Sequence, residues 1–321
     1  MPFFQGEVGG DSMMSPYTFF IKLTRKIRQY FSLLHRNAYN TRGERIISGQ
    51  INLEWVPNGN LGDELAPIIY DWMLERKGIN KDVTIRSTYH LMTIGSMVGS
   101  WNFDSVIWGS GIHLFSNVSK LYSLRRHQKL DIRAVRGPIT RKALLACGHD
   151  CPEIYGDPAV LIPLIYTPAR CAKKYKISIV LHYHADLLWE NEVKKYNNLN
   201  CIRIDTKDYK HFISEILSSE KIISSSLHGI ILSEAYGVPA VFLNTGEYVD
   251  DAFMKYYDWY FSTGRFSVKV ARSLDEAVRM TPMELPNLEE MQVTLLNSFP
   301  YDLWEVQETV SPDCVGGMRD E

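Results

Sequence analysis

Short apolar runs alternate with turns rich in glycine, serine and asparagine along most of the chain. The clearest unit lies at 221–244, where an apolar run at 222–223 precedes the serine turn 224–226, a helical pattern at 230–236 and another apolar run at 240–243. A strand, a turn, a helix and a second strand in this order form the building block of a parallel sheet. The pattern therefore predicts an α/β fold.

The same succession of elements is predicted along the rest of the chain. Apolar runs bounded by turn residues predict strands at 47–53, 83–87, 104–110, 132–135, 176–181 and 201–204. Apolar residues at helical spacing predict helices at about 63–76, 138–145, 209–219, 274–280 and 288–297. Glycine-rich turns follow strands in both halves, and we expect two α/β domains that face each other across a cleft, where small-molecule sites usually lie.

The length of 321 residues also suits two domains better than one. A stretch at 163–175, with two prolines, several basic residues and no periodicity, is interpreted as the linker between them. The predicted segments are an N-terminal extension with a basic amphipathic helix at 1–44, a first domain at 45–165, a second domain at 166–275, and C-terminal helices with a tail at 276–321.

The helix of the extension is predicted between residues 15 and 38, where basic residues fall largely between apolar residues at helical spacing. A basic amphipathic helix can lie on an anionic membrane surface. It can equally pack on the protein's own body with its basic face in solvent. Both interpretations stay open, and the first would place the protein at the inner face of the cell membrane.

Composition narrows the classes of partner. The net charge is −2, with 45% hydrophobic and 22% charged residues, so the chain resembles an ordinary soluble protein and has no overall field that attracts nucleic acid. No apolar run approaches the roughly 20 residues that span a bilayer, and no signal peptide is expected. The odd number of cysteines, 5, favours reduced thiols and a cytoplasmic location.

Two clusters contain residue types that bind metals. The segment CGHDC at 147–151 has two thiols and a histidine, but no second ligand pair follows at zinc spacing. His182 and His184 alternate at the end of a predicted strand near Asp186, without an assigned third ligand. We therefore expect no metal and no cofactor, and His182 is either a single site residue or a structural one.

Hydroxyls, a histidine and a glycine meet where the helix near 230 begins. Ser225, Ser226, Leu227, His228 and Gly229 stand at a helix N-terminus, where unpaired N–H groups and the helix dipole attract anions.

Two turns in the first half add candidates. Gly111 and His113 follow a predicted strand, and glycines there let a ligand approach closely. Arg136 stands on a strand-to-helix turn, where its guanidinium suits a carboxylate or phosphate, although a solvated surface arginine explains it equally well.

A further turn contains Asn60, Gly62 and Asp63. Capping of the following helix explains the carboxylate of Asp63, because acidic groups in a first turn favour the helix dipole. A site role requires that this turn face a ligand.

These motifs resemble the polysaccharide pyruvyl transferase family. The resemblance rests on NLGDELAP at 60–67, IWGSGIH at 107–113, RAVRGP at 133–138, YGDPAVL at 155–161, LHYHAD at 181–186 and SSSLHGIILSEAYGVPAV at 224–241. They occur in the family's order over roughly residues 45–245, and the branch that decorates bacterial exopolysaccharides is the most similar.

The resemblance implies a GT-B-like fold of two Rossmann-like domains, the first on the acceptor side of the cleft and the second on the donor side. It implies phosphoenolpyruvate as a co-substrate, whose enolpyruvyl group moves onto two hydroxyls of one sugar to give a cyclic ketal and phosphate. The acceptor is expected to be a lipid-linked or nucleotide-linked saccharide.

Roles follow for the candidate residues. His228 is expected to be the general acid, and Asp63 or His113 the base or a ligand of the acceptor hydroxyl. Those assigned to the donor are Ser225, Ser226, Leu227, Gly229, Arg136 and Glu234, and those assigned to the acceptor are Asn60, Gly62, Gly111, His113 and His182. Glu234 either bonds a sugar or ribose hydroxyl or is a satisfied helix carboxylate.

One position departs from the family. Many members carry an arginine immediately before Leu-His-Gly, where this chain has Ser226. The change removes one expected clamp for the donor, which Arg136 or Arg141 would replace if the cleft brings either close.

Two other functions stay open. One is a GT-B glycosyltransferase that uses a nucleotide sugar, with Glu234 on the ribose. The other, motivated by Ser226, is a non-catalytic saccharide-binding subunit of an envelope assembly complex.

Overall fold

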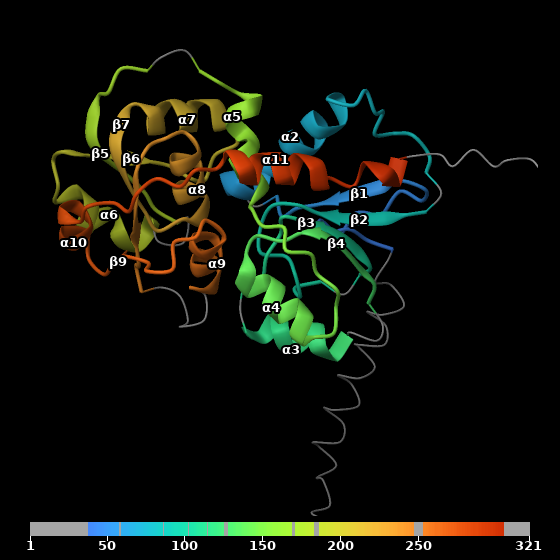
Figure 1. The fold of residues 1–321 in the computed structure, drawn as a ribbon. Coiled ribbons are helices and arrows are strands. Elements are labelled where there is room, and N and C mark those ends of the chain that lie inside the picture. The colour runs from blue at the N-terminus through green and yellow to red at the C-terminus, as the bar shows by residue number, and fades with distance from the viewer. Residues whose placement is uncertain are drawn as a thin grey trace, which may run out of the picture.

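The computed structural model describes residues 38–304 except 58, 86, 102, 114, 125–127, 169–170, 183–185 and 247–252. These residues form two parallel sheets that lie side by side, each with helices packed against it (Figure 1). The predicted α/β fold is therefore confirmed.

The first sheet runs in sequential strand order, and all its neighbours pair in parallel. Its strands are β1 (Ile51–Glu54), β2 (Tyr89–Met92), β3 (Ser105–Trp108) and β4 (Leu130–Ala134). Apolar side chains leave the sheet on both sides and enter two different core clusters. Helix α2 (Leu61–Glu75) covers one face, and α3 (Phe115–Leu124) and α4 (Pro138–Ala146) cover the other (Figure 1).

The second sheet has the order β6-β5-β7-β8-β9, which is 2-1-3-4-5 in chain order and common among doubly wound sheets. Its strands are β5 (Tyr175–Val180), β6 (Leu199–Ile202), β7 (Ser219–Ser224), β8 (Ala240–Leu243) and β9 (Val270–Ala271). Helices α7 (Tyr209–Leu217) and α8 (Leu227–Ala235) pack on one face, and α6 (Asp186–Lys194) and α10 (Leu274–Arg279) on the other. The strand order reverses between β5 and β7, and such a switch point is where these sheets bind ligands.

The two halves share one hydrophobic core. Apolar side chains of α2 belong to the same cluster as those of α7 and α8. Between the halves lie η1 (Pro158–Leu161) and α5 (Ile162–Ile165), which contact both α2 and α8. The amide of Leu61 donates to the carbonyl of Ile204 at 2.9 Å, which holds the start of α2 beside the second sheet.

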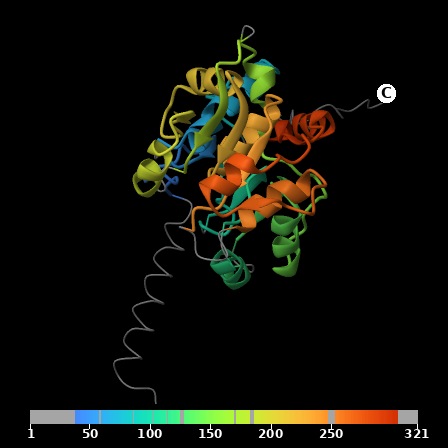
Figure 2. The ribbon, with the colours of Figure 1, turned by 90° about the vertical axis from the view of Figure 1, so that its left-hand side faces the viewer.

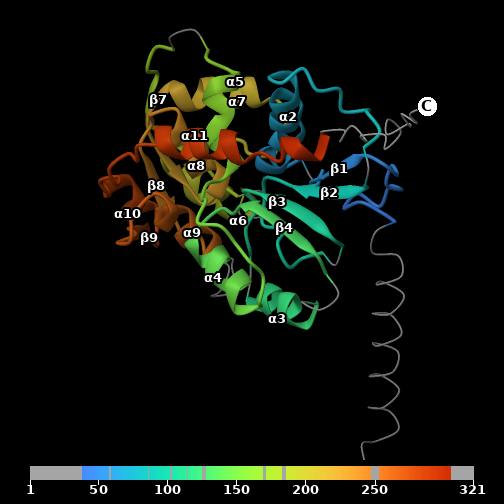
Figure 3. The same ribbon diagram turned by 45° about the vertical axis from the view of Figure 1, so that its right-hand side comes forward.

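The C-terminal helix α11 (Glu289–Ser298) returns to the first half and packs against β4 and η1 (Figures 1 and 3). The indole N–H of Trp108 on β3 donates to the carbonyl of Leu295 at 3.0 Å, and the ring of Phe299 meets Trp108 edge-on at 4.9 Å. The turn η2 (Tyr301–Trp304) follows. In Figure 2, with the second half facing the viewer, α11 lies at one edge of the molecule.

Two sequence expectations need correction. The described residues of 83–87 form no strand: Val83 is exposed, and Ile85 makes a single backbone bond to Gly49. The strand lies at β2 instead, where the polar His90 interrupts the apolar run. Helix α9 (Met254–Ser262) was not predicted, because polar and aromatic side chains occupy its buried positions and hide the periodicity.

The predicted amphipathic helix lies almost wholly outside the described residues, since 1–37 are not among them. Within the part of the chain that the structure describes, every helix is too short to cross a lipid bilayer.

Candidate active site

A cavity of about 340 Å³ lies where the two halves meet. Its wall is built largely from residues that follow strands. They are Val56, Asn60 and Asp63 after β1, five residues within 95–101 after β2, His113 after β3, Arg136 after β4, His182 after β5, and Ser226, Leu227 and His228 after β7. The carboxyl ends of both sheets therefore point to one place, and α9 adds Lys255 to the wall.

Ser225 joins β5 and β7 at the switch point of the second sheet. Its hydroxyl accepts a hydrogen bond from the amide of His182 at 2.9 Å, and its own amide donates to the carbonyl of Val180 at 3.1 Å. The phenol of Tyr256 donates to its carbonyl at 2.6 Å. These bonds hold the start of α8, where Ser226 is the N-cap residue and makes no side-chain capping bond.

The imidazole of His228 is held between the two halves. A Cβ atom on Gly62 would lie 1.7 Å from Nδ1, so only glycine lets α2 approach the ring this closely. On the opposite side, Nε2 lies 3.6 Å from Oδ2 of Asp157, whose side chain is fully buried. The other oxygen of Asp157 accepts a hydrogen bond from the amide of Ala159 at 3.0 Å and so caps η1.

Lys255 contributes a buried amine to the same cavity. Burial, together with the positive charge of Arg136, lowers the pKa of Lys255 to about 7, while the carboxylate of Asp63 acts in the opposite direction. An amine with such a pKa can bind an anion or exchange a proton near neutral pH.

Arg136 is fully buried, so the interpretation as a solvated surface arginine is wrong. Its Nη1 donates to the hydroxyl of Ser96 at 2.8 Å, and its Nη2 donates to the carbonyl of Ile112 at 2.6 Å. A Cβ atom on Gly111 would lie 2.5 Å from the guanidinium carbon. Gly111 thus makes room for the arginine.

Asp258 on α9 faces this guanidinium, with 3.4 Å between its Oδ2 and Nε of Arg136. It also accepts from the amides of Ile139 and Thr140 at 2.8 and 3.1 Å, and from the Thr140 hydroxyl at 2.7 Å. Burial raises the pKa of Asp258, against the effect of Arg136 and these bonds. By capping α4, helix α9 fixes Lys255 and Arg136 relative to each other.

Most of the predicted site residues meet at this cavity. Asn60, Asp63, His113, Arg136, His182, Ser226, Leu227 and His228 line it. Gly62, Gly111 and Ser225 lie behind the lining residues. The two glycines leave room for His228 and Arg136, and Ser225 holds the backbone of His182.

Two predicted donor residues do not reach the cavity. A Cβ atom on Gly229 would lie 2.4 Å from the hydroxyl of Ser224, so this glycine serves the packing of α8 on its sheet. Glu234 bonds Arg265 through both carboxylate oxygens, at 2.6 and 2.7 Å, and accepts from the indole N–H of Trp259 at 3.0 Å. Donor binding by either residue stays a prediction without geometric support.

Sequence reasoning missed the lining residues within 95–101 and two charged residues of this site, Asp157 and Lys255. Asp157 lies in the motif YGDPAVL, but its sequence context indicates only a tight turn. Lys255 belongs to the unpredicted α9 and carries no motif. Its single signal is a lysine within an aromatic-rich segment.

Neither metal cluster gains support. No three or more His, Cys, Asp or Glu side chains are grouped to hold a metal ion in the part of the chain that is described, and His184 lies outside it. The thiols of Cys147 and Cys151 each lie 3.6 Å from a backbone carbonyl.

Two known proteins are similar to this chain in sequence. Uncharacterized protein L143 of Acanthamoeba polyphaga mimivirus is 28% identical over 217 residues, which cover 64% of this chain and 71% of that protein. Succinoglycan biosynthesis protein ExoV of Rhizobium meliloti (strain 1021) is 28% identical over 214 residues, covering 63% of this chain and 61% of that protein.

A solved structure of a functional uncharacterized protein from Klebsiella pneumoniae covers 81% of this chain and 100% of its own, at 12% identity and a TM-score of 0.46, which is too distant to support an inference. The sequence model of a family described as polysaccharide pyruvyl transferase matches residues 60–247. This match spans more than half of the chain and includes cavity residues from both sheets. The chain therefore belongs to the polysaccharide pyruvyl transferase family, and it is a transferase.

Proposed function

We propose that this transferase moves the enolpyruvyl group of phosphoenolpyruvate onto two hydroxyls of a sugar and releases phosphate during exopolysaccharide or cell-surface glycan biosynthesis. The observation that carries this proposal is the cavity itself, where Lys255 and Arg136 meet His228 at the N-terminus of α8. Membership of the family supports pyruvyl transfer. The relative named for succinoglycan biosynthesis supports a polysaccharide as the product.

The charges of the cavity suit a donor that carries a carboxylate and a phosphate. Lys255 supplies the positive charge that an arginine at position 226 would bring, and Arg136 adds a second. Arg141 does not take this part, because its Nε donates to the carbonyl of Cys151 and it does not line the cavity. A volume of about 340 Å³ accommodates such a donor and part of a sugar ring.

The chemistry needs an acid and a base. His228 gives a proton to the CH₂ carbon of the donor, which makes the carbon bearing the phosphate electrophilic. One sugar hydroxyl attacks that carbon and its proton passes to Asp63. The second hydroxyl then attacks as phosphate leaves, its proton passes to the departing phosphate, and the ketal closes.

In this proposal the two sheets form a GT-B-like pair. The first sheet, with Asn60, Asp63 and His113, stands on the acceptor side, and the switch point of the second sheet stands on the donor side. We expect the protein to act in the cytoplasm on a lipid-linked acceptor. Residues 15–38 would attach it to the inner face of the membrane. Liposome co-sedimentation that survives deletion of residues 1–40 would exclude that attachment.

The test is phosphate release from phosphoenolpyruvate, measured with a panel of lipid-linked and nucleotide-linked saccharides. We expect release only when a saccharide acceptor is present, and a loss of at least about a hundredfold in His228→Ala. His211→Ala, a change at an exposed histidine of α7, is the matched control and should keep full activity.

Other results would support one of the two alternative functions or remove the role of His228. Consumption of a nucleotide sugar without phosphoenolpyruvate would indicate the glycosyltransferase. Full turnover by His228→Ala would remove the acid role, and no turnover of either donor with any acceptor would favour a binding subunit.

A further inference from the structure

The pair of His228 and Asp157 joins the two halves at the cavity wall. Nε2 of His228 and Oδ2 of Asp157 face each other at 3.6 Å, and both atoms are buried without a hydrogen-bond partner among the described residues. The carboxylate of Asp157 does not line the cavity and stands behind the ring. Its buried charge therefore acts on the imidazole and not directly on a bound molecule.

The other nitrogen of the ring points toward α2. Nδ1 lies where a Cβ atom of Gly62 would stand, and the neighbouring Asn60 and Asp63 both line the cavity. The two nitrogens thus have different surroundings. Nε2 is turned to a buried carboxylate, and Nδ1 lies against the start of α2, where Asn60 and Asp63 line the cavity.

We propose that Asp157 is a positioning residue, which keeps the proton of the neutral His228 ring on Nε2 and so makes Nδ1 the nitrogen that gives a proton to the substrate. A neutral ring with its proton on Nδ1 would leave two buried acceptors facing each other, which is unfavourable. The inference rests on the proposed function only in what it says about the substrate.

The proton balance of the step is simple. The charged ring carries protons on both nitrogens, and the Nε2 proton points at the carboxylate of Asp157. The N–H bond at Nδ1 breaks as a C–H bond forms at the CH₂ carbon of the donor. The ring is left neutral with its remaining proton on Nε2, and Asp157 stays ionised throughout.

Charged groups on other elements also face this cavity. Lys255 from α9 and Arg136 after β4 oppose a charged imidazole, whereas Asp63 from α2 favours one, and His182 after β5 adds a second imidazole. The carboxylate of Asp157 lies within ion-pair distance of Nε2, and we expect it to offset the effect of the two cations on the imidazole.

The first test needs no substrate. Protein labelled with ¹⁵N at histidine, with His228 assigned by its absence in His228→Gln, reports which nitrogen holds the proton of the neutral ring. We expect Nε2 in the unaltered protein. In Asp157→Asn we expect a mixture of the two tautomers. A proton on Nδ1 in the unaltered protein, which requires no variant to fold, would overturn the proposal.

The second test is the pH profile of turnover with phosphoenolpyruvate. Asp157→Asn retains an oxygen that can cap η1, yet we expect kcat at pH 7 to fall at least about tenfold and the alkaline limb of the profile to move to lower pH. Asp208→Asn makes the same change at the exposed cap of α7 and should leave the profile unchanged. A lower kcat without a moved limb would make Asp157 merely structural. If NMR gives the expected tautomer but no turnover is measured, the role of Asp157 toward the ring is supported and the proposed function is contradicted.

Discussion

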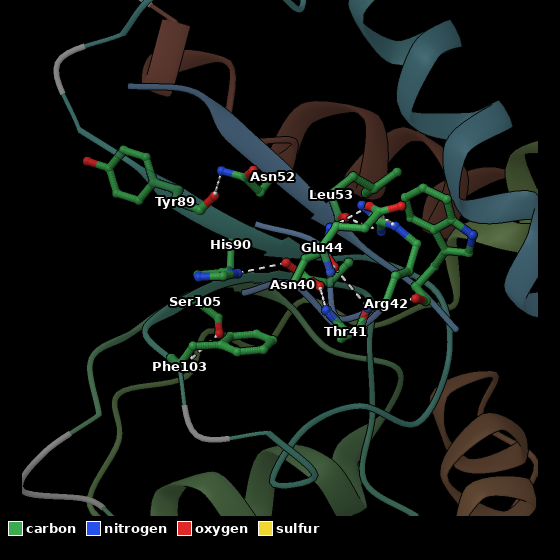
Figure 4. Close-up of polar contacts among 12 residues, drawn as sticks. Asn40, Thr41, Arg42, Glu44, Asn52, Leu53, Tyr89, His90, Phe103 and Ser105 are labelled. Carbon is green, nitrogen blue, oxygen red and sulfur yellow. Dashed lines mark hydrogen bonds and ion pairs between the residues drawn. The ribbon is translucent and has the colours of Figure 1, made fainter. Parts of the chain in front are cut away.

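Two buried histidine–carboxylate pairs in this protein differ in what surrounds them. His90 and Glu54 stand on the neighbouring strands β2 and β1, with 2.7 Å between Nδ1 and Oε1 (Figure 4). The second oxygen of Glu54 accepts from the amide of Thr41 at 2.6 Å, and the His90 ring stacks on Phe103 at 4.1 Å. The His228 pair joins different halves, and its atoms are 3.6 Å apart.

The difference separates a pair enclosed within the first half from one that borders the cavity. Every strong contact of Glu54 and His90 is internal to the first sheet and the segment before it, and neither side chain lines the cavity. His228 makes no such short bond and does line it. Both pairs are buried and join a histidine to a carboxylate, so we expect the position relative to the strand ends to decide which histidine can act on a substrate.

We expect the largest effect from Gly62→Ala, which disturbs the surroundings of His228. The added Cβ atom would stand 1.7 Å from Nδ1 of His228, a distance that forces the ring or the start of α2 to move. We expect kcat/KM to fall at least about a hundredfold, since small displacements of a catalytic group have effects of this size. Steady-state kinetics with phosphoenolpyruvate measure it.

The matched control is the double variant Gly62→Ala with His228→Gly, in which the ring no longer opposes the methyl group. Its thermal stability should recover relative to the single variant, while its activity should not. A Gly62→Ala protein as active as the unaltered one would show that the contact between α2 and His228 is not needed.

Glu54→Ala tests the structural pair. Removal of Glu54 leaves the buried His90 and the partly buried amide of Thr41 without their acceptor, and we expect about 2 kcal/mol less stability in urea unfolding. The folded fraction should keep its kcat. Glu75→Ala at the exposed end of α2 should change stability by less than about 0.5 kcal/mol. A lower kcat in Glu54→Ala would show that the pair of Glu54 and His90 also affects turnover.

The site was largely predictable because parallel strands converge at their carboxyl ends. Asp63, Arg136 and His228 were expected from turns that follow predicted strands, and all three line one cavity. Strand β8 was predicted with its observed bounds, since a buried strand between glycine and asparagine turns has few alternatives.

The rest depended on partners that sequence spacing does not reveal. Glu234 is occupied by Arg265, which lies 31 positions away. Lys255 enters the cavity only because Asp258 docks α9 onto α4. The order of the first sheet and the core shared by both halves likewise follow from long-range packing, for which the local pattern carries no signal.

The smallest effect we expect concerns the buried amine of Lys255, whose charge should lower the stability of the folded protein. The pKa of Lys255 is lowered to about 7 in the folded protein from an ordinary value of 10.5. Below pH 7 the folded and unfolded states are both protonated, so folding carries the full cost of a buried charge. Between about 7 and 10.5 only the unfolded state holds the proton, and stability rises with pH. We therefore expect Lys255→Met to raise Tm by about 3 °C at pH 6, and the gain to vanish toward pH 10.5.

Lys221 is the matched control for this measurement. Burial lowers its pKa as well, but its amine donates to the carbonyl of Val278 at 2.7 Å and to two further carbonyls near the end of α10. Lys221→Met removes these bonds and should lower Tm at pH 6, the opposite sign to Lys255→Met. If both variants shift Tm in the same direction, or if the Lys255→Met gain is independent of pH, then the charge at Lys255 is not destabilising. Its place in the cavity would then be as structural as that of Glu54 in the first sheet.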